Sequence, residues 1–193
     1  MNFRNRETTT DMEEKFTVKK HIYHNYANLS MAHAAIAAKR EDYGDKDYEI
    51  RSAMFRDLMN GTKKIRPISE DDQFLSKDHC NYCGSKKKLT TDHIFPKGAF
   101  PEYEKENEMV VCSVCKKSRR NMDLLEWMDA REDFLPLMVI RRYLKLVHLF
   151  CQENDLMSMD LEEAPDDLPF RMQSWPDEFW PAEYLKLVAM SKK

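Results

Sequence analysis

Residues 80–115 decide the fold, and they read CNYCGSKKKLTTDHIFPKGAFPEYEKENEMVVCSVC. The stretch begins and ends with a pair of cysteines at Cys-x2-Cys spacing, Cys80 with Cys83 and Cys112 with Cys115. Two such pairs supply the four thiolates of a tetrahedral structural zinc, each sulfur about 2.3 Å from the ion. The pairs are 28 residues apart, which is longer than a minimal zinc ribbon allows. We therefore expect one structural Zn²⁺ bound by all four cysteines, with an inserted element between the pairs.

Disulfides or buried free thiols are the alternatives to zinc. No leading apolar segment resembles a signal peptide, so we expect a cytoplasmic protein whose thiols are reduced. No apolar run approaches the roughly 20 residues of a membrane span, and no membrane partner is expected. The fifth cysteine, Cys151, lies in an apolar helical run and is predicted to belong to the core.

The composition is that of a soluble globular protein with many surface charges. Of 193 residues, 42% are hydrophobic and 34% are charged, and only four are glycine. This argues against a loop-rich or all-β chain. We predict an α+β, mostly helical protein in which a small zinc-stapled core is flanked by helical segments. The expected parts are a leader (1–14), an N-terminal helical arm (15–76), the zinc-stapled core (77–130), and a helical and aromatic tail packing on that core (131–193).

Apolar spacing predicts long helices over residues 16–40, 48–59 and 137–152. Within the zinc-stapled core we expect short strands at 89–91 and 108–111. One helix is expected over 115–130, with Met122, Leu125 and Met128 facing inward. The order strand, loop, strand, helix is a ββα unit. The proline-punctuated aromatic tail is expected to wrap over the helices.

Positive charge is concentrated around the cysteine pairs. Residues 77–121 contain ten Lys or Arg and six Asp or Glu, a net charge of +4, whereas the whole chain carries −3. Such a face would attract phosphate, although an ordinary solvated surface is the alternative. Residues 153–178 hold nine acids and one base; this stretch is a candidate to cover the basic face or to recruit a partner. The predicted nucleic-acid-binding residues are Lys86, Lys87, Lys88, Lys116, Lys117, Arg119 and Arg120.

Asp92 and His93 lie between the two cysteine pairs, directly after the first predicted strand. A carboxylate is a hard oxygen ligand for a divalent ion, and an imidazole titrates near neutral pH. Together they are the groups that metal-assisted hydrolysis requires. A lone histidine is more often structural, but the position of His93 between zinc ligands favours a function.

The combined pattern resembles the zinc-stapled HNH (ββα-metal) endonucleases over about residues 77–127. It consists of the cysteine pairs, Asp92-His93-Ile94-x-Pro96, Asn107 five residues before Cys112, and a basic helix that Cys112-x2-Cys115 opens. The flanking segments resemble a bacterial subgroup with helical arms around that core.

The resemblance implies a role for each matching residue. Asp92 would bind a catalytic divalent ion (Mg²⁺, Mn²⁺ or Ni²⁺), and His93 would be the base that takes a proton from the water attacking phosphorus. Asn107 would steady the loop that carries the base. The ion would stabilise the charge of the phosphorane and the departing 3′ oxygen.

One position departs from the family pattern. The family usually has Asn or His directly after the last cysteine, as second protein ligand of the catalytic ion, and this chain has Lys116. A protonated lysine cannot bind a metal, and its charge repels one. Four outcomes are open. Asp92, water and phosphate hold the ion; Ser118 or Asn121 replaces the missing ligand; or the ammonium takes over part of the ion's role, or the site is inactive and the fold serves binding.

Two functional hypotheses follow. The first is a metal-dependent endonuclease that hydrolyses DNA with little base specificity, in restriction or anti-phage defence by family analogy alone. The second is a catalytically impaired zinc module that binds nucleic acid or protein. The pair formed by Asp92 and His93 favours the first, and Lys116 favours the second. DNA is the expected partner, and a protein partner or a homo-oligomer is left open.

Overall fold

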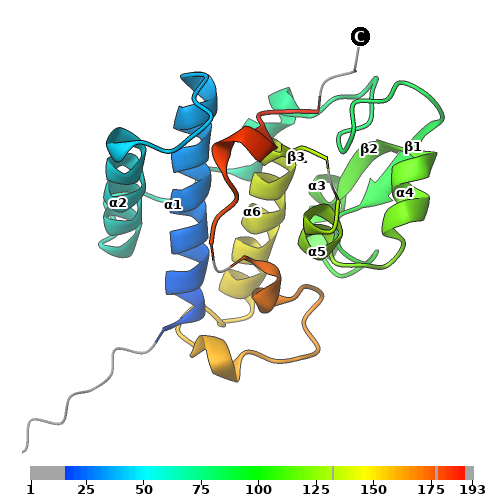
Figure 1. The fold of residues 1–193 in the computed structure, drawn as a ribbon. Helices are drawn as coiled ribbons and strands as arrows, with labels where there is room; N and C mark the ends of the chain where they lie inside the picture. Colours follow the sequence, from blue (N-terminus) through cyan, green and yellow to red (C-terminus); the bar gives the residue numbers. More distant parts are fainter. Residues whose placement is uncertain (1–15, 132, 177, 190–193) are drawn as a thin grey trace, which may run out of the picture.

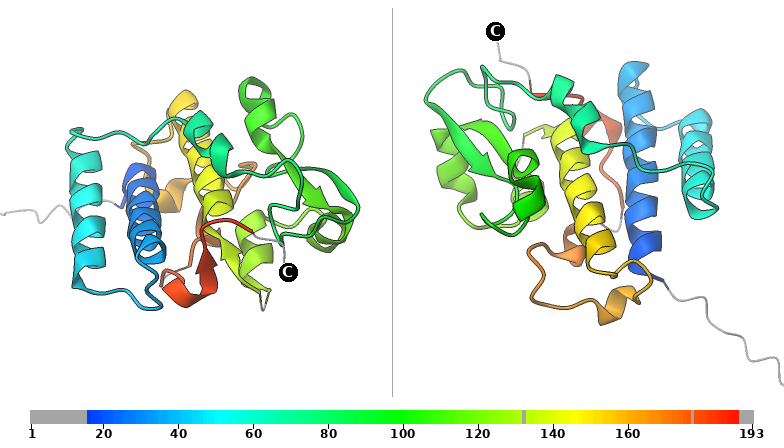
Figure 2. Two further views of the ribbon diagram at one scale, coloured as in Figure 1. Left: turned by 90° about the horizontal axis from the view of Figure 1, so that it is seen from above. Right: turned by 180° about the vertical axis from the view of Figure 1, so that it is seen from behind.

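In a computed structural model of the protein, a small ββα unit packs on one side of a layer of three long helices (Figure 1). The structure describes residues 16–131, 133–176 and 178–189. The long helices are α1 (Val18–Ala37), α2 (Asp45–Met59) and α6 (Leu137–Glu153). Helix α1 contacts both α2 and α6, and the further views show the three side by side (Figure 2). The α+β, mostly helical class is as predicted. The predicted leader, residues 1–14, lies outside the described residues.

Shorter elements build the ββα unit and the connections. Strands β1 (Leu89–His93) and β2 (Glu108–Cys112) are antiparallel, with Leu89 opposite Cys112 and His93 opposite Glu108. Two-residue strands β3 (Leu135–Pro136) and β4 (Leu185–Lys186) pair in parallel. The remaining elements are η1 (Ile68–Phe74), η2 (Pro101–Tyr103), α3 (Glu104–Asn107), α4 (Ser113–Arg119), α5 (Leu124–Asp129), η3 (Leu161–Glu163), η4 (Met172–Ser174) and η5 (Ala182–Tyr184).

The predicted single helix over 115–130 is wrong, because the chain breaks between α4 and α5. Arg120 ends α4 with a backbone φ of +54°, a left-handed value that a continuing helix excludes. Asp123 then caps α5, because its carboxylate accepts a 2.9 Å hydrogen bond from the Leu125 N–H. Met122 lies in the break and is exposed, contrary to prediction, whereas Leu125 and Met128 are buried as predicted.

Helix α6 is the centre of the core, and the aromatic tail lies across it. Most of its side chains are buried, including Cys151 as predicted. Phe170 and Trp175 of the tail are buried and contact the ring cluster around Tyr143 of α6. Further along, the Trp180 indole N–H donates to Asp129 of α5 at 2.9 Å. The tail thus joins the helical layer to the ββα unit. In the described part of the chain, none of the helices has the length and apolar content for a membrane crossing.

A buried ion network fixes η1 against α6. The Asp71 side chain has no solvent exposure, and its carboxylate pairs with Arg141 and, at 2.8 Å, with the Lys145 ammonium. The neighbouring Arg142 guanidinium bonds to Asp72 and to the Glu106 carbonyl oxygen, both at 2.6 Å. Because Glu106 belongs to α3, the network also anchors the segment that returns the chain to β2.

Asp71→Asn is expected to lower the free energy of unfolding by about 3–5 kcal/mol, because it leaves two largely buried cations without their shared partner. Urea unfolding followed by circular dichroism measures this. The matched control is Glu70→Gln, which removes a surface pair between exposed side chains and should cost at most about 1 kcal/mol. Equal effects of the two substitutions would contradict the structural importance of the network.

Candidate metal centre and basic groove

The four predicted cysteines lie together and could hold a zinc ion. The sulfurs of Cys80, Cys83, Cys112 and Cys115 all lie within 4.8 Å of one another. The Cys83 and Cys112 sulfurs are 3.8 Å apart, which is about the edge of a tetrahedron with 2.3 Å metal–sulfur bonds. The donor set therefore fits a closed structural zinc site, and the chain contains a module consistent with a zinc staple.

Backbone geometry explains why the cysteines converge. Gly84 follows the first pair with φ +76° and donates its N–H to the Cys80 carbonyl oxygen at 2.8 Å, so that the chain turns tightly. Cys112 ends β2 and is also the N-cap of α4, because its sulfur accepts a 3.4 Å hydrogen bond from the Cys115 N–H. Asn81 joins the two halves, since its backbone and side-chain N–H groups both donate to the Val110 carbonyl oxygen.

The thiols respond differently to this crowding. The pKa of Cys80 is lowered to about 5, first because the Cys115 thiol donates a hydrogen bond to its sulfur. Burial raises the pKa of Cys83 to about 11. Zinc binding requires thiolates, so it would release the protons of the neutral thiols.

The side chains of Asp92 and His93 point to opposite faces of β1, because successive residues of a strand alternate between its two faces. Asp92 is buried. Its Oδ2 atom accepts hydrogen bonds from the Arg119 guanidinium at 3.0 Å and the Tyr82 hydroxyl at 3.2 Å. Burial raises the pKa of Tyr82, so the phenol remains protonated and able to donate. The predicted metal ligand is thus already paired with a cation inside the protein.

Arg119 itself is buried, and its donors are used internally. Besides Asp92, the guanidinium bonds to the Tyr82 hydroxyl at 2.9 Å, the Ile94 carbonyl oxygen at 3.0 Å and the Met122 carbonyl oxygen at 3.3 Å. Arg119 also lines the groove, but it is buried there and its side chain serves internal hydrogen bonds; its predicted contact with nucleic acid stays a prediction. The sequence contained a signal for the burial of Arg119 that the sequence reasoning missed. Cys115 and Arg119 are four residues apart, so they share one face of α4, and this face points inward.

Lys116, the residue that departs from the family pattern, binds the strand that carries Asp92. Its ammonium donates to the Thr91 carbonyl oxygen at 2.5 Å. Two cations, Lys116 and Arg119, therefore act on neighbouring positions of β1.

Asn107 fixes the loop that follows His93. Its side-chain oxygen accepts from the Phe95 N–H at 2.9 Å and its amide nitrogen donates to the Phe95 carbonyl oxygen at 3.2 Å, while its own carbonyl oxygen accepts from the Ile94 N–H at 2.9 Å. The residue is fully buried. Three hydrogen bonds thus hold the backbone beside His93 in one conformation.

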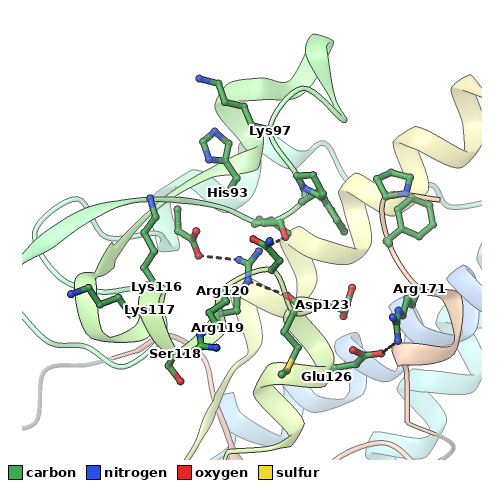
Figure 3. A pocket seen from close by; sticks show the side chains of 18 of the residues that line it. His93, Lys97, Lys116, Lys117, Ser118, Arg119, Arg120, Asp123, Glu126 and Arg171 are labelled. Carbon is green, nitrogen blue, oxygen red and sulfur yellow. Dashed lines mark hydrogen bonds and ion pairs between the residues drawn. The ribbon is translucent and has the colours of Figure 1, made fainter. Parts of the chain in front are cut away.

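A basic groove of about 1260 Å³ runs past His93 between β1, α4, α5 and the tail. Figure 3 shows Lys116 and Lys117 of α4 at one end, Arg171 of the tail at the other, and His93 with Lys97 along the side. Arg171 pairs with Glu126 of α5 at 3.0 Å, which connects the tail to the groove wall. The structure brings Lys116, Lys117, Arg120 and the buried Arg119 of the predicted basic residues into this groove, and it adds Lys97 and Arg171, which the sequence reasoning missed.

The other predicted basic residues, Lys86, Lys87 and Lys88, are exposed in the turn before β1 and do not line the groove. Among the described residues of the acidic stretch 153–178, those that form part of the groove wall are residues 168–171, and these contain no acid.

His93 has two carboxylate neighbours that the sequence reasoning also missed. Its Nε2 atom is 3.3 Å from a Glu104 oxygen and 3.5 Å from a Glu108 oxygen. Glu108 is the β-ladder partner of His93, and Glu104 is the first residue of α3. The side chain of His93 is 23% exposed, so the ring connects the groove to this acidic pair.

No protein-family model, curated protein or solved structure matches the chain. The resemblance to HNH endonucleases therefore rests on the sequence pattern of this chain alone.

Proposed function

We propose that the protein is a divalent-metal-dependent endonuclease of the HNH type, which hydrolyses phosphodiester bonds of DNA in the basic groove. The observation that carries the proposal is the position of His93. It lies in the groove wall at the end of β1, a strand whose first residue pairs with Cys112 of the four-cysteine cluster, and its following loop is fixed by Asn107.

Different residues of the groove would have different roles in hydrolysis. Lys97, Lys117 and Arg120 are exposed in the groove and would attract the phosphate backbone. His93 would direct the attack of water on phosphorus, the step for which an imidazole is suited near neutral pH. A divalent ion would supply charge stabilisation of the transition state. The cysteine cluster would act by holding β2 and α4 in register with β1.

Incubation of zinc-replete protein with supercoiled plasmid, in separate reactions with Mg²⁺, Mn²⁺, Ni²⁺ and EDTA, tests the proposal. Nicked and then linear plasmid is expected with at least one divalent ion and not with EDTA. Plasmid that stays supercoiled with every ion would contradict the nuclease.

A specific observation favours the second candidate, a zinc module that binds nucleic acid without cleaving it. Lys116 and Arg119 place two cations beside the Asp92 segment where the family holds its ion. Lys116→Asn separates the candidates, because it restores the family residue at this position. An inactive wild type together with a cleaving Lys116→Asn variant would identify a disabled site, whereas a cleaving wild type supports the nuclease.

A further inference from the structure

We propose that His93, Glu104 and Glu108 form a divalent-cation site at the edge of the basic groove, for Mn²⁺ and similarly hard divalent ions. The ligand atoms of the three side chains lie within 4.8 Å of one another. One imidazole nitrogen and two carboxylate oxygens are a mixed donor set that suits these ions. The site lies on the face of β1 opposite Asp92.

The spacing of the donor atoms fits coordination. His93 Nε2 is 3.3 Å from Glu104 Oε1 and 3.5 Å from Glu108 Oε1. Ligand atoms about 2.1 Å from a common ion are about 3.0–3.4 Å apart when they occupy neighbouring positions. The three side chains therefore need only small movements to share an ion.

Two atoms in the cluster have unmet bonding capacity. His93 Nε2 and Glu104 Oε2 are both inaccessible to solvent, and neither has a hydrogen-bond partner of acceptable geometry among the described residues. Buried polar atoms are nearly always paired. A cation between them would satisfy both.

The scaffold holds the three ligands on anchored backbone. Glu108 faces His93 across the antiparallel ladder, and Glu104 begins the single turn of α3 that leads into β2. Asn107, between the two glutamates, is bonded to the loop after His93. The local charge also favours a cation at this cluster over one at Asp92. The cluster offers two carboxylates, whereas the carboxylate of Asp92 is already paired with Arg119.

The catalytic part of this inference rests on the proposed function, because the site is where the divalent ion of the proposed reaction would bind. It changes the role of His93, since a nitrogen that binds the ion holds it in place and does not itself accept a proton. Ion binding can be measured without nucleic acid, so the two proposals can fail separately.

Titration of zinc-replete protein with Mn²⁺, followed by electron paramagnetic resonance of free Mn²⁺, tests the site. Wild type is expected to bind one Mn²⁺. Glu104→Gln and Glu108→Gln should each weaken binding at least tenfold, a loss at the lower end of that seen when even supporting groups of metal sites are removed. Glu102→Gln, an exposed neighbour outside the cluster, is the control for charge and should change the affinity less than twofold.

Asp92→Asn tests the competing location and should also leave Mn²⁺ affinity within twofold. Three results would overturn the proposal: no Mn²⁺ binding by wild type at millimolar concentration, loss of binding in Asp92→Asn but not in the glutamate variants, or an equal loss in Glu102→Gln. Mn²⁺ binding without DNA cleavage would support this site and contradict the proposed nuclease.

Discussion

His93→Ala is expected to lower the rate of DNA cleavage by about 10²–10⁴-fold, the range over which a positioned acid–base group contributes. The imidazole lies in the groove wall and contacts Glu104 and Glu108. Whether it accepts the proton or holds the ion, its removal takes away the group that directs the attacking water. Single-turnover cleavage of a labelled duplex measures the effect.

The matched control for this variant is His24→Ala, which removes an exposed histidine from α1. It should cleave at the wild-type rate. Both variants should retain about one zinc per chain and the wild-type melting temperature, so that a lower rate reports on the site and not on the fold. Cleavage by His93→Ala at the wild-type rate would exclude His93 from the reaction.

Cys112→Ser is expected to abolish zinc binding and to unfold the ββα unit. Cys112 is a predicted zinc ligand, the last residue of β2 and the N-cap of α4. Its loss therefore removes a ligand at the point where the strand meets the helix. Apparent zinc-binding free energies of about 10–16 kcal/mol in small zinc modules are also folding free energies, so the remaining contacts of so small a unit would not replace them.

Elemental analysis and circular dichroism test this expectation. Wild type should contain about one zinc per chain and Cys112→Ser almost none, with loss of cooperative melting of the ββα unit. Cys151→Ala is the control, because Cys151 is buried in α6 and lies outside the cluster. It should keep its zinc even if its stability falls. A Cys112→Ser variant that retains zinc would show that the staple is assigned to the wrong residues.

Local spacing explains which features the sequence predicts well. The cysteine pairs, the two strands and the long helices are each encoded within a few residues, by ligand spacing or by apolar period. The break at Arg120 is not encoded in this way, because a non-glycine residue at positive φ carries no composition signal. The continuous apolar pattern of residues 122–128 therefore predicted one helix where two exist.

The chemical neighbours of the candidate site depend on register and burial, which the sequence does not state. Glu108 meets His93 only because β1 and β2 pair with His93 opposite Glu108. Arg119 belongs to a run of basic residues that resembles a solvated surface, yet it is drawn inward to pair with Asp92. Both contacts change the chemistry expected from the motif, since they occupy Asp92 and give His93 two carboxylates.

Analysis of the ends produced from a labelled duplex tests the central claim most directly. Hydrolysis with a departing 3′ oxygen, as the proposed function requires, leaves 5′-phosphate and 3′-hydroxyl ends. We predict these ends in reactions of zinc-replete wild type with a divalent ion, and their formation at a rate about 10²–10⁴-fold lower with His93→Ala. An uncut duplex, or ends that carry a 3′-phosphate, would contradict the account.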